Sequence, residues 1–494
     1  MLILFERGIF TKTKTIILIV ILSLVGIGIL GGAVFFFSQQ AMPVVSEATP
    51  SPSVSPDVTP TPIVTTTPDA IRLEESKANY EKGLALFEQE KYSEAEPYFK
   101  AVIEDDDDNY AQAQEKLQKC MKAITEGYCL KGKELLEKTL YLKAEQLIDD
   151  ALELYSDSPE LKKLKDEAHR LATTLVKYEG PVYHVFFHSL IVYPELCFTG
   201  DGMEQGYNYW MTTVYEFKLM LEEMHNRGYT LIDLRDMFST DASGKVVKND
   251  IMLPEGKKPL IISVDDVSYY KYMEKDGFAD KLVFVNEGNV ATLVKTPEGK
   301  EIVTRDGDVV PILDDFVKAN PDFSYKGAKG VLALTGYEGI LGYNTLHDNP
   351  DWEKEQAQVQ PIVDKLKATG WAFANHSFTH RRTYSERTIT LDYLKYDMER
   401  WLKEVGSILG PTNLYISPFG ATFKKDDPRH RYIVSKGFNV YCGVGARAFY
   451  EFYGDNVFME RINLDGYKMF HSPQVLKELF DVEKVYDPVR PPMK

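Results

Sequence analysis

Cysteine is scarce in this sequence of 494 residues and occurs only at Cys120, Cys129, Cys197 and Cys442. No two of these cysteines form a CxxC pair, so a structural zinc finger is not expected. The four positions also define no disulfide framework, and they do not indicate a compartment. The HExxH motif of zinc proteases is missing as well, which argues against that class of metalloenzyme.

Positive charge is also in short supply. The chain has 57 lysines and arginines against 74 aspartates and glutamates, which gives a net charge of −17. This acidic balance argues against nucleic acid as a partner and against binding to an anionic membrane surface. The length of the chain indicates more than one domain.

Residues 15–37 contain no charged side chain, and basic residues precede them, while none follows before Arg72. An apolar run of this length spans a hydrocarbon core of about 30 Å. The positive-inside rule places residues 1–14 in the cytoplasm and the rest of the chain outside the cell. Residues 38–41 form a poor cleavage site, which favours an uncleaved single-pass anchor in the cell membrane over a signal peptide.

Residues 38–70 are rich in proline, threonine and serine, which predicts an extended linker. Residues 71–177 predict a small all-α domain with an internal repeat, which resembles the tetratricopeptide pattern. The repeated positions are Gly83, Tyr92, Ala95 and Phe99, followed by Gly132, Tyr141, Ala144 and Ile148. Two repeats bury little surface, so we expect this unit to pack on its neighbour or on a protein partner.

From residue 178 to residue 494, short apolar runs alternate with amphipathic stretches, and this alternation predicts an α/β fold, a parallel (β/α) barrel. The runs are residues 182–188, 230–234, 260–264, 331–334, 371–374, 413–417, 439–442 and 457–462. Residues 267–330 interrupt the alternation. We expect β ribbons at 281–294 and 301–310 in this insertion, which is either a lid over the site or a decoration of the barrel.

Two histidines four residues apart, His376 and His380, follow one of the predicted strands. On a helical turn this spacing brings both imidazoles to one face, where they can bind the same metal ion. Another predicted strand ends in Asp265 and Asp266, and carboxylates there are expensive to desolvate unless they have partners. One aspartate and two histidines leave a tetrahedral zinc with an open position, as in a catalytic site.

Three motifs carry a resemblance to a known family. They are Val264-Asp265-Asp266, the segment from His376 to His380 (HSFTH), and Tyr415-Ile416-Ser417-Pro418-Phe419-Gly420. In this order they resemble the motifs of the NodB-homology polysaccharide deacetylases, carbohydrate esterase family four. The similarity covers about residues 180–470. It implies a distorted barrel of seven or eight strands that removes acetyl groups from glycans.

The resemblance also implies roles for residues. Asp266, His376 and His380 would bind a divalent metal, most simply Zn²⁺, and Asp265 would be the general base. Tyr415, Pro418 and Phe419 would contact the substrate in the groove. The general acid has two candidates, because the usual C-terminal histidine has only a rough counterpart at His471, and His188 ends the first barrel strand.

Two departures from the family pattern bear on the site. The arginine that opens the third motif and pairs with the base is replaced by Ile416, and Arg381 and Arg382 are the nearest alternatives in the sequence. Val267 replaces the glycine that usually follows the second aspartate. Without a partner, the base would lose the charge that keeps its pKa low and its orientation fixed.

Three functions are compatible with these patterns. The first is a membrane-anchored, metal-dependent N-deacetylase of a surface polysaccharide or of cell-wall glycan. The second is a catalytically silent relative that binds glycan or a protein partner. The third is an O-acetyl esterase with the same machinery. A complete set of two aspartates and two histidines favours an enzyme, because a binding module does not need to retain four costly polar groups.

Overall fold

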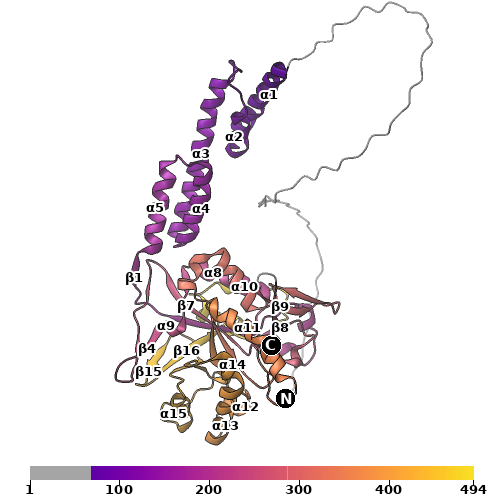
Figure 1. The fold of residues 1–494 in the computed structure, drawn as a ribbon, viewed down its shortest axis with the longest axis vertical. Helices are drawn as coiled ribbons and strands as arrows, with labels where there is room; N and C mark the ends of the chain where they lie inside the picture. The colour runs from indigo at the N-terminus through magenta and orange to yellow at the C-terminus, as the bar shows by residue number, and fades with distance from the viewer. Residues whose placement is uncertain (1–67, 286–287, 494) are drawn as a thin grey trace, which may run out of the picture. The chain divides into compact units, whose positions relative to one another are not determined.

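Seven parallel strands close into a barrel in the computed structural model, which describes residues 68–285 and 288–493. In order around the ring they are β7 (Lys258–Asp265), β11 (Val331–Leu334), β12 (Ala372–Asn375), β13 (Leu414–Ile416), β14 (Val440–Val444), β16 (Val457–Asn463) and β2 (Tyr183–Phe187). Strand β2 pairs again with β7, which closes the ring. The (β/α) barrel predicted from the sequence is confirmed (Figure 1).

One of the eight predicted strands, at residues 230–234, lies outside the ring of seven. Strand β3 (Tyr229–Leu231) pairs with β7 beside Lys258–Leu260, at the amino-terminal end of that strand. Strand β11 pairs with the same edge of β7 further along, at Ser263–Asp265. The edge of β7 is thus shared by two strands, and only β11 continues around the barrel.

Side chains alternate along the strands between the inside and the outside of the barrel. Val185, Ile262 and Val264 face outward and join the core that the surrounding helices cover. Ile261, Ala333 and Ile416 belong to a second apolar cluster, which fills the inside. The interior is therefore a packed core, and polar side chains inside it need specific partners.

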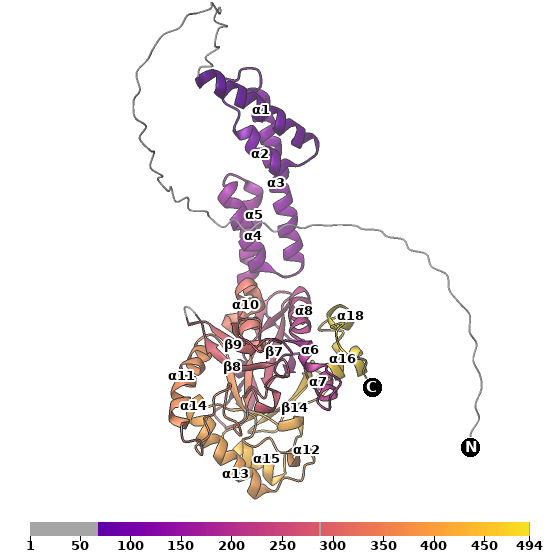
Figure 2. The same ribbon diagram turned by 90° about the vertical axis from the view of Figure 1, so that its right-hand side faces the viewer.

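Helices surround the barrel, as the views in Figure 1 and Figure 2 show. The longer ones are α8 (Val214–Asn226), α10 (Val309–Ala319), α11 (Trp352–Ala368), α13 (Leu391–Trp401) and α15 (Pro428–Ser435). Shorter ones are α6 (Pro194–Cys197), α7 (Glu204–Trp210), α9 (Leu234–Met237), α12 (Arg382–Ser385), α14 (Ser407–Leu409), α16 (Gly466–His471), α17 (Pro473–Leu476) and α18 (Val482–Val485). Short strands add small sheets: β1 (Leu175–Lys177) with β6 (Met252–Pro254), β4 (Phe238–Thr240) with β5 (Val246–Lys248), and β15 (Tyr450–Phe452) on β16.

The insertion after β7 contains a three-stranded antiparallel sheet of β8 (Ala279–Phe284), β9 (Val290–Lys295) and β10 (Glu301–Thr304). The ribbon predicted for residues 301–310 ends at Thr304, and helix α10 begins at Val309. Asp308 caps this helix through its side chain, which accepts a hydrogen bond from the Val309 amide. A capping aspartate decides the boundary here, and the apolar residues after it lie on a helix.

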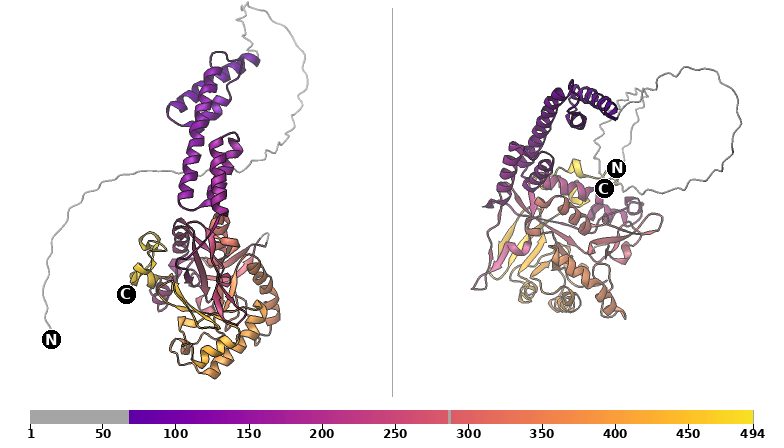
Figure 3. Two further views of the ribbon diagram at one scale, coloured as in Figure 1. Left: turned by 90° about the vertical axis from the view of Figure 1, so that its left-hand side faces the viewer. Right: turned by 45° about the horizontal axis from the view of Figure 1, so that its top comes forward.

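Residues before the barrel form α1 (Pro68–Glu88), α2 (Tyr92–Lys100), α3 (Tyr110–Glu137), α4 (Tyr141–Leu154) and α5 (Pro159–Thr173). The long helix α3 packs against α2 and also against α4 and α5 (Figure 3). Gly83 permits close packing, since a Cβ there would meet the Phe99 ring at 2.9 Å. The Tyr141 hydroxyl donates to the carbonyl of Glu255, and Lys143 Nζ lies 3.0 Å from Asn320 Oδ1, so this unit contacts the barrel segment.

The predicted membrane helix at residues 15–37 lies outside the described residues, as do residues 1–14 and most of the predicted linker. Within the described part of the chain, no helix combines the length and the apolar character needed to cross a membrane.

Candidate metal centre and catalytic site

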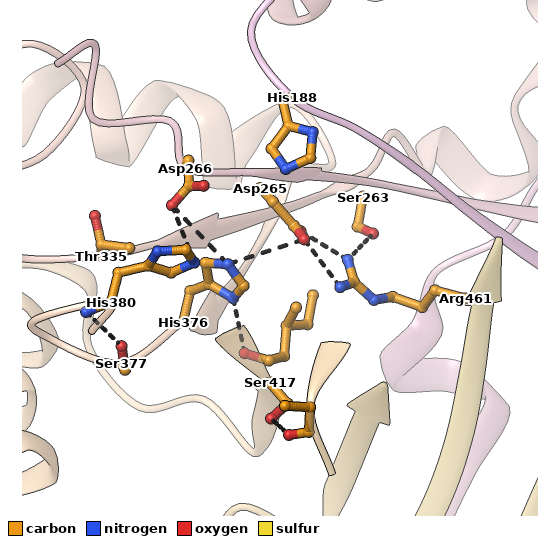
Figure 4. Close-up of polar contacts among 12 residues, drawn as sticks. His188, Ser263, Asp265, Asp266, Thr335, His376, Ser377, His380, Ser417 and Arg461 are labelled. Carbon is orange, nitrogen blue, oxygen red and sulfur yellow. Dashed lines mark hydrogen bonds and ion pairs between the residues drawn. The ribbon is translucent and has the colours of Figure 1, made fainter. Parts of the chain in front are cut away.

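Two adjacent aspartates face the same cluster of side chains because the backbone turns between them. Asp265 is the last residue of β7, and Asp266 has a φ of 60°, in the left-handed region that only a few residue types tolerate. On a regular strand the two side chains would point to opposite faces. The turn instead brings both carboxylates to the carboxyl end of the barrel (Figure 4).

Asp266, His376 and His380 converge there. Their ligand atoms all lie within 4.8 Å of one another. Asp266 Oδ1 is 3.9 Å from His376 Nε2 and 3.8 Å from His380 Nε2. Ligand atoms of a tetrahedral zinc site lie about 3.3 Å apart, given metal–ligand bonds of about 2 Å. The two distances from Asp266 exceed this value by about half an ångström, and the 4.8 Å limit of the whole set exceeds it by about 1.5 Å, so small side-chain movements would close these three residues around one ion.

The segment that carries the two histidines is a loop, so the predicted helical turn is wrong. Ser377 and His380 both have positive φ values, 61° and 43°. Side chains hold this conformation: Asn375 Oδ1 accepts the Ser377 amide at 2.8 Å, and Ser377 Oγ accepts the His380 amide at 3.0 Å. Such local bonds compete with the helical pattern. The rings of His376 and His380 still meet, with centroids 5.0 Å apart.

The second ring nitrogen of His376 sets its orientation. Nδ1 donates to the carbonyl oxygen of Ile416 at 2.8 Å, which leaves the Nε2 lone pair facing Asp266. Burial lowers the pKa of His376, which favours the neutral ring that binds metals. Burial raises the pKa of Asp266, but interaction with the protonated forms of His380 and His376, together with the hydrogen bond from Tyr270, outweighs that effect and the pKa is lowered overall. An ionised carboxylate and a neutral imidazole fit a divalent cation.

Tyr270, from the insertion, orients the carboxylate of Asp266, one of the candidate metal ligands. Its hydroxyl donates to Asp266 Oδ1 at 2.8 Å and lies 2.8 Å from Thr335 Oγ1. Sequence reasoning did not identify this tyrosine, although it lies only four residues after Asp266. Hydrogen bonds to metal ligands fix their direction and raise affinity for the ion.

We expect Tyr270→Phe to weaken Zn²⁺ binding by about 10–100-fold, because it removes the hydrogen bond that orients Asp266. Competition with a chromogenic chelator measures the change. Tyr272→Phe is the matched control, because Tyr272 stacks on Tyr270 with centroids 5.7 Å apart while the hydroxyl that donates to Asp266 is that of Tyr270. Equal affinities of the two variants would contradict this role of Tyr270.

Arg461, on β16, pairs with Asp265. Its Nη1 and Nη2 donate to the two carboxylate oxygens at 2.6 and 2.9 Å, and the guanidinium is fully buried. Burial raises the pKa of Asp265, but the Arg461 charge and His376 outweigh it and hold the pKa far below its usual range. The carboxylate of Asp265, the predicted base, therefore stays ionised and fixed in direction, and Arg461 takes the place expected for the arginine that Ile416 replaces.

The arginines that are nearest in the sequence do not take this role. Arg381 lies over the Tyr393 ring at 4.7 Å, and Arg382 pairs with Glu386 at 2.9 Å. Arg461 was missed because it is remote in sequence. The sequence feature that could have identified it is an arginine within the apolar run at residues 457–462, because an unpaired charge on a buried strand would be costly.

Hydrogen bonds to buried polar side chains in the barrel interior also hold Arg461. Ser263 Oγ accepts from Arg461 Nη1 at 3.1 Å and lies 3.0 Å from His184 Nε2. These residues fill the barrel interior directly under Asp265, and the Phe186 ring lies 4.2 Å from the Arg461 guanidinium carbon. The ion pair between Asp265 and Arg461 is thus buried within the packed interior of the barrel.

Of the two candidates for the general acid, the structure brings only His188 to the site. Its ring lies above both aspartates in Figure 4, and its charge contributes to lowering their pKa values. Its Nδ1 is 3.1 Å from the Trp210 carbonyl oxygen, which is an acceptor, so Nδ1 donates. His471 is exposed on α16, with its ring on Tyr467 at 4.3 Å.

Of the three predicted substrate contacts, one is placed to make such a contact. The Phe419 side chain is 50% exposed, and its ring centroid is 4.2 Å from that of His380. Tyr415 is fully buried and stacks on Tyr441 with centroids 5.4 Å apart, and Pro418 is also buried. Tyr415 lies on strand β13 and points into the core, and Pro418 is buried in the turn that follows the strand, so neither side chain presents an exposed face to a substrate as predicted.

No family model and no curated protein sequence matches this chain. A search of solved structures found a family 4 carbohydrate esterase from Streptomyces lividans in complex with acetate. The two are 14% identical in sequence, and the match covers 32% of this chain and 72% of that chain, with a TM-score of 0.18. This similarity is weak, and the geometry of the site is the stronger guide to its chemistry.

Proposed function

We propose that this protein is a metal-dependent deacetylase that hydrolyses N-acetyl groups of amino sugars in glycans. The observation that carries the proposal is the meeting of three metal-binding side chains, Asp266, His376 and His380, with an arginine-paired carboxylate at Asp265. Asp265 Oδ2 lies 3.9 Å from His376 Nε2, so the base is beside the ion that these residues would hold. A metal-binding set with a separate, ionised carboxylate beside it is the equipment that hydrolysis of an acetyl group requires.

When bound, the divalent ion supplies Lewis-acid activation of a water molecule and of the acetyl carbonyl group. Asp265 accepts the proton of that water, because each of its oxygens keeps a lone pair beyond the bonds to Arg461. Arg461 holds the carboxylate ionised and in one direction. His188 Nε2 then donates a proton to the departing nitrogen of the sugar. The products are acetate and a free amino sugar.

The location that we propose is based on the N-terminal sequence. Residues 15–37 would anchor the chain in the cell membrane as a single span, with residues 1–14 in the cytoplasm and the catalytic part outside. The substrate would then be an acetylated glycan of the cell wall or an exopolysaccharide. Helices α1–α5 would serve as a spacer or bind a protein partner.

The decisive test uses the purified full-length chain, stripped of metal and reloaded with Zn²⁺. We expect acetate release from N-acetylglucosamine oligomers or peptidoglycan, its loss with chelator, and its return with Zn²⁺. Release from acetylxylan alone would instead show an O-acetyl esterase. Metal binding and glycan binding without acetate release from any substrate would show a silent relative.

We expect His380→Ala to abolish both Zn²⁺ retention and acetate release, because it removes one of three ligands. His169→Ala is the matched control, since His169 is an exposed histidine on α5 that pairs with Glu145 at 3.0 Å. Metal content by atomic absorption and acetate release together measure the outcome. Full metal content in His380→Ala would exclude this site.

A further inference from the structure

Two exposed aromatic rings stack on each other beside the candidate acid. Trp210, at the end of α7, and Tyr467, in α16, have ring centroids 5.3 Å apart and an interplanar angle of 26°. The Trp210 side chain is 48% exposed and the Tyr467 side chain 38% exposed. We call this pair the Trp210–Tyr467 platform. Both rings keep surface in contact with water, and the Tyr467 ring also packs against the His471 ring, with centroids 4.3 Å apart.

Buried polar bonds hold the platform rigidly. Arg490 donates to the carbonyl oxygens of Asn208 and Met211 at 2.8 and 2.6 Å, and these residues flank Trp210. The Arg490 guanidinium is itself buried and pairs with Glu216 at 2.5 Å. Thr212 Oγ1 donates to the Leu464 carbonyl at 2.5 Å, which ties the Trp210 segment to the segment that leads into α16. The rings are thus preorganised, which lowers the entropy cost of binding.

The platform adjoins the site. The Trp210 carbonyl accepts from His188 Nδ1 at 3.1 Å, so the backbone of the platform is one hydrogen bond from the candidate acid. Tyr467 follows Asp465, whose carboxylate interacts electrostatically with His188. The platform lies where β16 and β2 end, whereas Phe419 lies beyond the end of β13, and β14 separates β13 from β16 in the ring. Exposed rings therefore lie on two sides of the metal-binding residues.

We propose that the Trp210–Tyr467 platform is a sugar-binding subsite, which stacks on a sugar next to the one that loses its acetyl group. Aromatic rings with one exposed face suit the apolar C–H face of a pyranose, and such rings add area without a flexible side chain. The substrate is then a chain of several sugars bound across the site. This inference rests on the proposed function for its substrate class.

The test compares the full-length, zinc-loaded protein on the N-acetylglucosamine hexamer and on the monosaccharide. In Trp210→Ala we expect the ratio of kcat/KM for the hexamer to that for the monosaccharide to fall about tenfold, mainly through KM, as expected for loss of an apolar contact of this size. Trp210→Phe should retain most of the ratio, because it keeps a ring. Phe452→Ala is the control: Phe452 is 40% exposed and lies on β15, opposite the amino-terminal end of β16, and its loss should leave the ratio unchanged.

A direct binding measurement separates this inference from the proposed function. Titration of the hexamer into the Asp265→Asn variant by calorimetry should show affinity that falls about tenfold when Trp210→Ala is added. Lower affinity in the double variant, together with a wild type that releases no acetate, would support the subsite and overturn the hydrolysis. An unchanged ratio and unchanged affinity in Trp210→Ala would overturn the subsite, even if the wild type releases acetate.

Discussion

Replacing Asp265 by asparagine is expected to lower kcat for acetate release by about 10³-fold while Zn²⁺ binding persists. Asparagine keeps the shape of the side chain but cannot accept a proton, and removal of a positioned base costs about 10²–10⁴-fold. The metal-binding set does not include Asp265, so the ion should remain. Steady-state acetate release and metal content, measured on the same preparation, check both parts.

The expected separation of binding from catalysis makes this variant informative. KM for the oligomer should change little, because only 3% of the surface of Asp265 is exposed and its carboxylate is occupied by Arg461. The His380→Ala variant, in contrast, should lose the ion and the activity together. Activity of Asp265→Asn within about tenfold of the wild type would show that another group takes the proton.

Replacing Arg461 by methionine is expected to have the largest effect on stability. Asp265 would remain as a buried carboxylate without its bidentate partner, and breaking a buried ion pair from one side costs about 3–5 kcal/mol. At about 2 °C per kcal/mol for a domain of this size, the melting temperature should fall by about 6–10 °C. Acetate release should also fall, because burial then raises the pKa of Asp265 without opposition from the guanidinium.

A double variant distinguishes the unpaired charge from lost packing. Asp265→Leu combined with Arg461→Met replaces the buried pair by apolar side chains, which often restores stability. Its melting temperature should return toward the wild-type value while acetate release stays absent. A double variant as unstable as Arg461→Met would show that packing around the guanidinium, including the Phe186 ring, causes the loss.

The stabilisation by this pair has a defined pH dependence. The pKa of Asp265 in the folded protein lies below its value of about 3.9 in an unfolded chain. A lowered pKa stabilises the fold only while the carboxylate is ionised. The contribution is therefore complete above the pKa of the unfolded chain, about 3.9, and is lost as the pH falls through the pKa of the folded protein. The contribution of the pair in the wild type should therefore be constant near neutral pH, whereas the difference in melting temperature from Arg461→Met should shrink as the pH is lowered and the buried Asp265 of the variant takes up a proton.

Much of the barrel could be predicted from local patterns. Buried parallel strands are nearly continuous apolar runs, so residues 260–264 and 371–374 predicted β7 and β12 within a few residues. Periodicity could not show that β3 stays outside the ring, because that depends on which strand occupies the edge of β7. The boundary between the predicted ribbon and α10 was missed because one capping side chain decided it.

The sequence by itself determined which side chains meet as a candidate metal site. Asp266 and the two histidines each follow an apolar strand, and the carboxyl ends of parallel strands share one end of a barrel. Even the wrong helical turn left this prediction intact, because the short loop keeps both rings together.

Only the tertiary structure decided how that site is supported. Arg461 is 196 residues from Asp265 along the chain, and it reaches the carboxylate because β16 closes the ring through β2. Closure likewise places His188 beside the two aspartates and turns Tyr415 into the core. Neighbours across a closed barrel are set by strand order and by the inward or outward alternation of side chains, and neither can be deduced from separation in the sequence.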